Sequence, residues 1–340
     1  MRELQRRPPI DAGRLIELID GFERRRIAVF GDLIVDEFIY GEIGRVSREA
    51  PVLILNYDST EIVPGGAGNA ASNVAALGGR PIVVGLVGRD EAGGRLLAAM
   101  DSMDAGGVAR PARYRTPTKT RILAGGVHSA KQQVVRIDRA SMPGAGEGFR
   151  SAVEARLLRA AARCDAMLVS DYGSGLVSPA LVAAARKELT RNVPLLVDSR
   201  YALLKFRGMT ACTPNEAEVE ALFGRRIGEN TQVLERSGRE LLERTRARAV
   251  LVTRGGRGMA LFERNRQTVH IAIYGSDQIA DVTGAGDTVI ATMTLALAAG
   301  GSFEEAARLA NYAGGLVVMK RGTATVSADE LRHAVLTDVD

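Results

Sequence analysis

Six short segments of the 340-residue chain are apolar on both faces and rich in β-branched residues. They are residues 26–32, 81–88, 165–171, 193–199, 209–215 and 248–254. A strand of this kind is buried on both sides of a sheet. Between most of them the apolar positions follow a helical period, at residues 67–79, 92–103, 151–164, 179–189 and 231–245. This alternation predicts an α/β fold: a mainly parallel sheet with helices on both faces, which is a three-layer α/β/α sandwich.

Two segments break the alternation, residues 37–60 and 113–138. Each has the pattern of short strands joined by hairpin turns, with Gly125–Gly126 as one turn, and neither has a helix to cover it. We expect them to form a small β-sheet that projects from the main sheet as a lid. The alternative is that they are edge strands of the main sheet. Residues 1–12 are expected to form a tail, and residues 13–338 one domain.

Polar residues stand at the ends of the predicted strands. Ligands of parallel sheets bind beyond the carboxyl ends of the strands, so these side chains should line one common edge. They are Asp32, Ser170, Asp171, Asp198, Asn215, Thr253 and Arg254.

Composition and charge exclude several classes of function. The net charge of +5 is spread along the chain, and there is no Trp and few other aromatic residues, so no platform for nucleic acid is evident. No apolar run is long enough to span a membrane, and the N-terminus has no apolar leader, so we expect a cytoplasmic protein. Cys164 and Cys212 fit small buried residues in a reducing compartment.

The stretch DVTGAGD, residues 281–287, joins a polar turn to an apolar helical pattern. Gly284 and Gly286 allow a sharp turn and bring backbone amides close to a ligand. Unpaired amides and the dipole at a helix start form an anion site. Asp287 beside that anion suits a base that takes the proton of an attacking hydroxyl during phosphoryl transfer. A helix cap at Asp281 or Asp287 is the alternative, but it explains only one of the two aspartates.

Asn215 and Glu218 stand three residues apart where another helical pattern begins, so they share one face. Mg²⁺ prefers oxygen ligands and keeps several waters, which an amide oxygen and a carboxylate can orient. The same spacing fits a capping box at a helix start. The two interpretations are compatible, and both remain open.

Gly65 and Gly66 precede a helical pattern that carries Asn69 near its start, and Asp32 and Asp36 follow the first predicted strand. Glycines that allow close approach, together with amide and carboxylate groups, suit the hydroxyls of a polyol such as a sugar. A metal site formed by the two aspartates is the less favoured alternative.

Four stretches together resemble the signatures of the ribokinase-like (PfkB) carbohydrate kinases. They are GDLIVD (31–36), PGGAGNAASNVAALG (64–78), VTRGGRGM (252–259) and DVTGAGDTVI (281–290). The resemblance covers about residues 25–335, and the last stretch is specific for the family. YGEIGRVSREAPVLIL (40–55), SDYGSGLVS (170–178) and KRGTATVSADEL (320–331) are similar in particular to its heptose 7-phosphate kinases. Two positions depart from those kinases: Asp198–Ser199–Arg200 replaces D-P-K, and Gly68 replaces Ala.

The resemblance implies a ribokinase-like sandwich and an ATP-dependent sugar kinase. ATP would phosphorylate the anomeric hydroxyl of D-glycero-β-D-manno-heptose 7-phosphate to give the 1,7-bisphosphate, a precursor of the lipopolysaccharide core. Asp287 would be the base, and the backbone amides of residues 284–286 would hold the developing charge. Asn215 and Glu218 would organise Mg²⁺ through water.

The resemblance also implies roles for further residues. Those near ATP would be Thr253, Arg254 and Gly256 at its phosphates and Asn311 at the adenine. Asp281, Thr283 and carbonyls within residues 320–325 resemble the family's potassium site. Those facing the sugar would be Asp32, Asp36, Gly65, Gly66, Asn69 and Asp171. The lid cations that could bind the 7-phosphate are Arg45, Lys119, Arg121 and Arg136.

Alternatives remain within and outside this class. One is a ribokinase- or fructokinase-like sugar or nucleoside kinase. The other, less favoured because Asp287 is present, is a non-catalytic sugar-binding regulator. Edge strands of the lid could pair between two copies of the chain, so we expect a homodimer through the lid. The expected ligands are small molecules only.

Overall fold

The computed structural model describes residues 11–125, 131–139, 144–275, 281–320 and 322–338. Its main sheet has nine strands in the order β13-β12-β11-β10-β9-β8-β1-β4-β5. Their bounds are β1 Arg26–Gly31, β4 Arg80–Leu86, β5 Asp104–Ala109, β8 Ala166–Asp171, β9 Leu195–Ser199, β10 Ala211–Cys212, β11 Ala249–Thr253, β12 Met259–Glu263 and β13 Val269–Ile271. The pairs are parallel except that β12 runs antiparallel to both β11 and β13. The predicted, mainly parallel sheet is confirmed.

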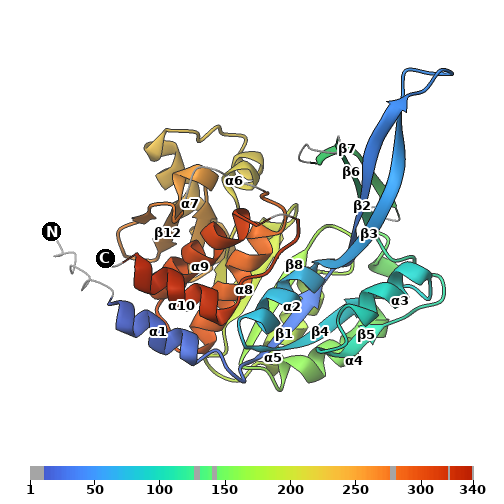
Figure 1. Cartoon of the computed structure of the whole chain (residues 1–340). Coiled ribbons are helices and arrows are strands. Elements are labelled where there is room, and N and C mark those ends of the chain that lie inside the picture. The colour runs from blue at the N-terminus through green and yellow to red at the C-terminus, as the bar shows by residue number, and fades with distance from the viewer. Residues whose placement is uncertain (1–10, 126–130, 140–143, 276–280, 321, 339–340) are drawn as a thin grey trace.

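Helices cover both faces of this sheet (Figure 1). One layer holds α1 Ala12–Asp20, α2 Ala67–Ala76, α3 Glu91–Ala98, α8 Ala285–Ala298, α9 Phe303–Val318 and α10 Ala328–Thr337. The other holds α4 Arg150–Ala161, α5 Pro179–Glu188, α6 Glu216–Phe223 and α7 Thr231–Thr245. Short 3₁₀ turns span Glu147–Phe149, Leu203–Lys205 and Gly255–Arg257. Each layer buries its own apolar cluster against the sheet, as the alternating pattern predicts.

A second, four-stranded sheet in the order β3-β2-β6-β7 stands apart from the main sheet. Its strands are β2 Leu33–Val46, β3 Leu53–Gly66, β6 Thr118–Gly125 and β7 Gln132–Arg139. Figure 1 shows the β2–β3 hairpin extending away from the body of the molecule. The lid is therefore a separate sheet, and the edge-strand alternative is wrong. The predicted turn at Gly125–Gly126 lies partly outside the described residues.

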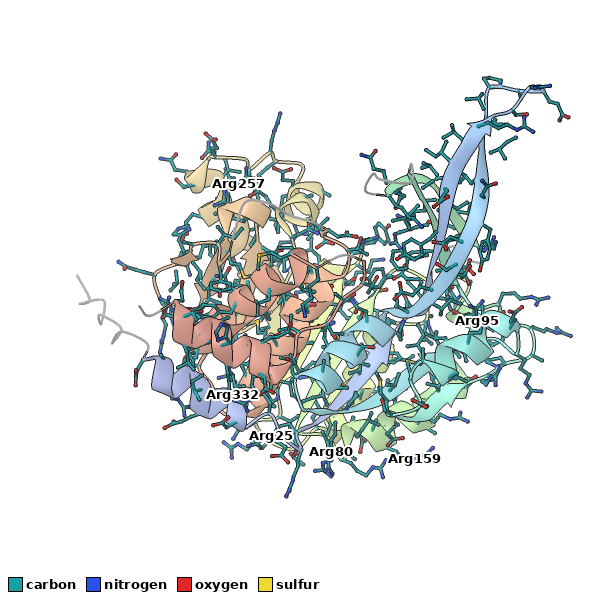
Figure 2. All side chains as sticks on the ribbon, viewed as in Figure 1. Arg25, Arg80, Arg95, Arg159, Arg257 and Arg332 are labelled. Atoms are coloured by element: carbon teal, nitrogen blue, oxygen red, sulfur yellow. The ribbon has the colours of Figure 1, made fainter. Side chains whose placement is uncertain are left out.

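Basic residues are found on more than one part of the molecule. Of the arginines labelled in Figure 2, Arg25, Arg80, Arg159 and Arg332 lie along the lower edge, and Arg95 and Arg257 lie apart from them. Cys164 and Cys212 are both buried and unpaired. Among the described helices, none is long and apolar enough to cross a bilayer.

Candidate active site

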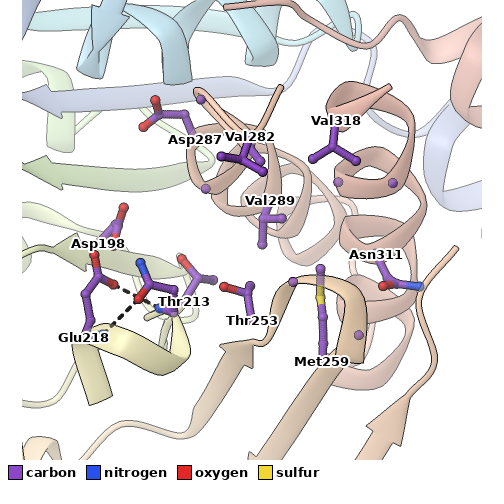
Figure 3. Close-up of a pocket in the computed structure, with 18 of the residues that line it drawn as sticks. Asp198, Thr213, Glu218, Thr253, Met259, Val282, Asp287, Val289, Asn311 and Val318 are labelled. Atoms are coloured by element: carbon purple, nitrogen blue, oxygen red, sulfur yellow. Dashed lines mark hydrogen bonds between the residues drawn. The ribbon is translucent and has the colours of Figure 1, made fainter. Parts of the chain in front are cut away.

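A cavity of about 350 Å³ opens at the edge of the main sheet where its parallel strands end (Figure 3). Such a volume is in the range of small-molecule sites. Strand-end residues line it, as the sequence predicts: Asp171, Asp198, Asn215 and Thr253. The start of α8 and the inner side of α9 complete the wall, through residues 284–287 and Asn311, Gly314 and Gly315.

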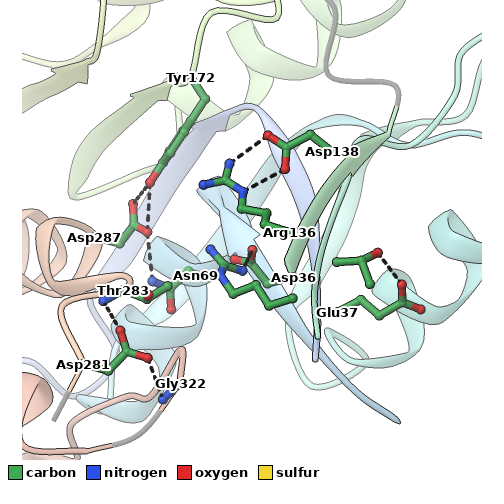
Figure 4. A network of polar contacts seen from close by, with 12 residues as sticks. Asp36, Glu37, Asn69, Arg136, Asp138, Tyr172, Asp281, Thr283, Asp287 and Gly322 are labelled. Atoms are coloured by element: carbon green, nitrogen blue, oxygen red, sulfur yellow. Dashed lines mark hydrogen bonds and ion pairs between the residues drawn. The ribbon is translucent and has the colours of Figure 1, made fainter. Parts of the chain in front are cut away.

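Asp287 lies in the first turn of α8 and is only 3% exposed. Its carboxylate accepts a hydrogen bond from Asn69 Nδ2 at 2.8 Å and from the Tyr172 hydroxyl, which is 3.2 Å from both oxygens (Figure 4). Burial raises the pKa of Asp287 to about 7, although the two hydrogen bonds act in the opposite direction. A carboxyl group that titrates near neutral pH is suited to act as a general base.

The glycine turn before α8 has the form that an anion site requires. Gly284 has φ +81°, and a side chain there would come within 2.5 Å of Asn69 Nδ2, so only glycine fits. Gly286 faces open space. The Ala285 amide donates a long hydrogen bond of 3.3 Å to Val282. Within the described residues the amides of Gly286 and Asp287 have no partner, so they remain available to an anion.

Asn215 and Glu218 form the capping box of α6 and also face the cavity. Asn215 Oδ1 accepts from the Glu218 amide at 2.8 Å, and Glu218 Oε2 accepts from the Asn215 amide at 2.9 Å. Burial raises the pKa of Glu218. Burial, and after it the charges of Glu218 and Asp287, also raises the pKa of Asp198. The capping interpretation is thus confirmed, and it leaves the second carboxylate oxygen of Glu218 outside the capping box.

On the lid side the charges are mostly paired. Asp36 on β2 forms a buried ion pair of 2.6 Å with Arg121 on β6. Gly65 lies against the same carboxylate, since a side chain there would come within 2.3 Å of Asp36 Oδ2. Arg136 makes two bonds of 2.8 Å with Asp138. Two of the three predicted phosphate-binding arginines, Arg121 and Arg136, are therefore already engaged with carboxylates.

Asp32 is hydrogen-bonded within the protein. Its carboxylate accepts from the amides of Tyr172 and Ser174, at 2.8 and 3.2 Å, and from the Ser174 hydroxyl. These bonds fix the loop that follows β8. Gly66, at φ +58°, packs against the Asp32 carbonyl. The buried charge of Asp32 is satisfied by this loop, and its role at the sugar stays a prediction.

Some residues predicted to contact the nucleotide are also hydrogen-bonded within the protein, and their roles stay predictions. The Arg254 side chain bonds to Glu216 at 2.8 Å and to the Gly228 carbonyl at 2.7 Å, and it does not line the cavity. Gly256 is not among the lining residues either, although its neighbour Gly255 is. Asn311 does line the cavity, and its amide donates to the Ala272 carbonyl at 2.8 Å.

The predicted potassium ligands are close together but partly occupied. Asp281 accepts hydrogen bonds from the amides of Thr283 at 2.8 Å and Gly322 at 3.2 Å. The Thr325 carbonyl accepts from Lys320 Nζ at 2.7 Å.

Asp171, predicted to face the sugar, lines the cavity. Its carboxylate accepts hydrogen bonds from the Gly173 amide and the Ser199 hydroxyl. The sugar-binding roles of Asp36, Gly65, Asn69 and Asp171 stay predictions.

Sequence reasoning missed Tyr172 and gave Arg200 no role. Both line the cavity, and the Arg200 guanidinium lies 5.0 Å from the centre of the Tyr172 ring. The available signal was the position of Tyr172, directly after a predicted strand that ends in Asp171. An aromatic residue at the carboxyl edge of a parallel sheet is a candidate site residue in the same way as its polar neighbours.

A parallel sheet with a β lid, and an aspartate among open amides at its carboxyl edge, define a sugar kinase of the ribokinase-like class. The chain belongs to the pfkB family carbohydrate kinases, whose pattern it matches over residues 24–330, and it is an ATP-dependent sugar kinase. The bifunctional protein HldE of Geobacter metallireducens is 42% identical over 310 residues, which cover 89% of this chain and 61% of that protein. HldE of Aeromonas hydrophila is 40% identical over 326 residues, 93% of this chain and 65% of that protein. The chain thus spans less than two thirds of the length of these relatives.

Solved structures show the same fold. Phosphofructokinase-2 from Escherichia coli in complex with potassium superposes with a TM-score of 0.72 at 20% identity, over 94% of this chain and 100% of that one. Ribokinase from Arabidopsis thaliana, complexed with ribose and ATP, gives a TM-score of 0.67 at 21% identity, over 92% and 98% of the two chains.

Proposed function

We propose that this kinase transfers the γ-phosphate of ATP to the anomeric hydroxyl of D-glycero-β-D-manno-heptose 7-phosphate and forms the 1,7-bisphosphate. The proposal is supported by the similarity to HldE proteins over about nine tenths of the chain. It concerns this region alone and not the remaining part of those longer relatives.

One observation carries the chemistry: Asp287 is buried, has a pKa near neutrality and lies beside unpaired amides at the start of α8. In the proposed reaction the Asp287 carboxylate accepts the proton of the attacking hydroxyl. The Gly286 and Asp287 amides then face the charge that develops on the phosphoryl oxygens. Asn69 holds the carboxylate in place from α2.

The donor set near α6 fits Mg²⁺. Glu218 and Asp198 bring carboxylates with raised pKa into one cavity with the amide oxygen of Asn215, an oxygen-only set of the kind that Mg²⁺ prefers. We propose that Asn215 and Glu218 hold the ion through water. When bound, it neutralises charge on the ATP phosphates.

The acceptor side is proposed to lie between α2 and the lid. Asp36, Gly65 and Asn69 would contact sugar hydroxyls. Lys119 is the cation proposed for the remote phosphate, because Arg121 and Arg136 already pair with carboxylates. Burial lowers the pKa of Lys119, and a bound phosphate would favour its charged form.

The test is ADP release with matched acceptors at equal concentration: heptose 7-phosphate, fructose 6-phosphate, ribose and adenosine. The proposal predicts the highest kcat/KM for the heptose, with at least a tenfold preference over the others. Preferred turnover of another acceptor would contradict the proposed substrate and retain the kinase. Absence of ADP release with the heptose and with the whole panel would contradict the reaction itself.

Two further proposals concern potassium and assembly. We infer a potassium site near Asp281, so replacement of K⁺ by Na⁺ should lower kcat.

We also propose a homodimer through the lid, whose strands expose Val134, Val135 and Ile137 on β7. A monomeric mass in light scattering would contradict the dimer.

A further inference from the structure

The hydroxyl of Tyr172 is one of the two side-chain donors to the Asp287 carboxylate. The hydroxyl lies 3.2 Å from each carboxylate oxygen, and Asn69 Nδ2 lies 2.8 Å from one of them. In a buried site, hydrogen bonds to a carboxylate favour its ionised form and fix its orientation. Tyr172 can therefore supply both effects.

The Tyr172 ring is held from two parts of the fold. Lys119 Nζ, on lid strand β6, lies 4.8 Å from the ring centre, and the Arg200 guanidinium, directly after β9, lies 5.0 Å from it. Cations over an aromatic face are attracted by its quadrupole. The ring therefore links the lid to the main sheet at the position of the base.

The backbone of Tyr172 is fixed as well. Its amide donates to Asp32 at 2.8 Å, and Asp32 also binds the next-but-one residue, Ser174. Gly173 between them has φ +86°, a conformation that favours glycine. Such a restrained loop places the phenol with little freedom to move away from Asp287.

We propose that Tyr172 is a positioning residue that keeps the Asp287 carboxylate ionised and aimed at the acceptor hydroxyl. This inference rests on the proposed kinase reaction, in which Asp287 is the base. The inference explains why the Asp32 loop, Gly173 and the two cations over the ring hold Tyr172 in place.

The direct test is Tyr172→Phe, which removes the hydroxyl and keeps the ring between its cations. Loss of a donor to a carboxylate raises its pKa, so the acid limb of the kcat–pH profile should move upward by about one pH unit. At pH values below the acid limb, kcat of the variant should be about tenfold lower than that of the wild type. KM for ATP should stay within about twofold of the wild-type value. The charged or titratable groups that face Asp287, besides Tyr172, are Asp36, Lys119 and Asp198, and all are retained in the variant.

Tyr201→Phe is the matched control. Tyr201 is 69% exposed and lies beside the same loop, close to Gly173, so its loss should leave the pH profile unchanged. A complementary variant places 3-fluorotyrosine at position 172. Its more acidic phenol is a stronger donor, so the acid limb should move to lower pH, and this variant also serves if the Phe variant fails to fold.

An unmoved acid limb in both Tyr172 variants, with folding verified by thermal melting, would overturn the proposal. An equal loss of kcat at every pH would also overturn it, because that result indicates a structural role alone. Failure of the wild-type protein to turn over any acceptor would instead refute the proposed function, so the two failures are distinguishable.

Discussion

Replacing Asp287 with asparagine is expected to stabilise the folded protein above neutral pH. The carboxyl group is buried, and burial raises its pKa to about 7, compared with an ordinary value of 3.8. A group whose pKa is raised on folding contributes stability at pH values below the unfolded pKa. That contribution is lost as pH rises through the folded pKa. Above pH 7 the wild-type protein therefore carries the full penalty of a buried charge.

The size of this penalty follows from the shift. A rise from 3.8 to about 7 is about 3 pKa units, which corresponds to about 4 kcal/mol at 1.36 kcal/mol per unit. That figure already includes the hydrogen bonds from Asn69 and Tyr172, which lower the pKa. Asparagine removes the charge, but its amide has a single acceptor oxygen and places an NH2 group where the second carboxylate oxygen stood, which offsets about 2 kcal/mol. We expect Asp287→Asn to raise the free energy of unfolding by about 2 kcal/mol at pH 8.

The assay is urea unfolding followed by circular dichroism between pH 5 and pH 8. The stability difference between the variant and the wild type should grow by about 2–3 kcal/mol from pH 5 to pH 7 and then level off. Asp101→Asn, at an exposed position, is the control and should give a difference near zero throughout. A variant less stable than the wild type at pH 8, or a difference that does not depend on pH, would refute the reasoning.

Two further predictions use matched pairs. Asn215→Ala and Ser302→Ala each remove the N-cap of a capping box, so each should lower the free energy of unfolding by about 1 kcal/mol. Only the Asn215 variant should raise the Mg²⁺ concentration needed for half-maximal activity, and equal Mg²⁺ curves would count against the proposed metal position. Gly65→Ala would drive a methyl group within 2.3 Å of the Asp36 carboxylate and should raise KM for the acceptor at least tenfold in steady-state kinetics. Gly94→Ala, an exposed helical position with open space around it, should leave KM unchanged and add about 0.5–1 kcal/mol of stability.

The strands at the centre of the main sheet could be predicted because both of their faces are apolar. β5 and β10 show the limit of that signal. β5 carries two glycines and no apolar run, so nothing distinguishes it from a loop. The predicted strand over 209–215 shortens to Ala211–Cys212, and Pro214 beyond it cannot donate to a ladder. Short strands of this kind depend on their neighbours in the sheet.

The site residues also divide into those that the sequence could predict and those that it could not. Asp287, Gly284 and Asn69 were predicted because residue type and spacing along a helix start carry information about chemistry. Pairings across the fold were not. Arg121 reaches Asp36 from a strand 85 residues further along the chain, and Asp32 is used by a loop 140 residues away. Only the topology brings these charges together, so the sequence could not tell a free cation from a paired one.

The central claim is that Asp287 takes the proton of the acceptor hydroxyl. The most direct measurement is kcat for Asp287→Asn with ATP and a sugar phosphate that the wild type turns over, at pH 8 and with folding verified. The account predicts a fall of about 10²–10⁴-fold with little change in KM for ATP. A kcat equal to that of the wild type would contradict it.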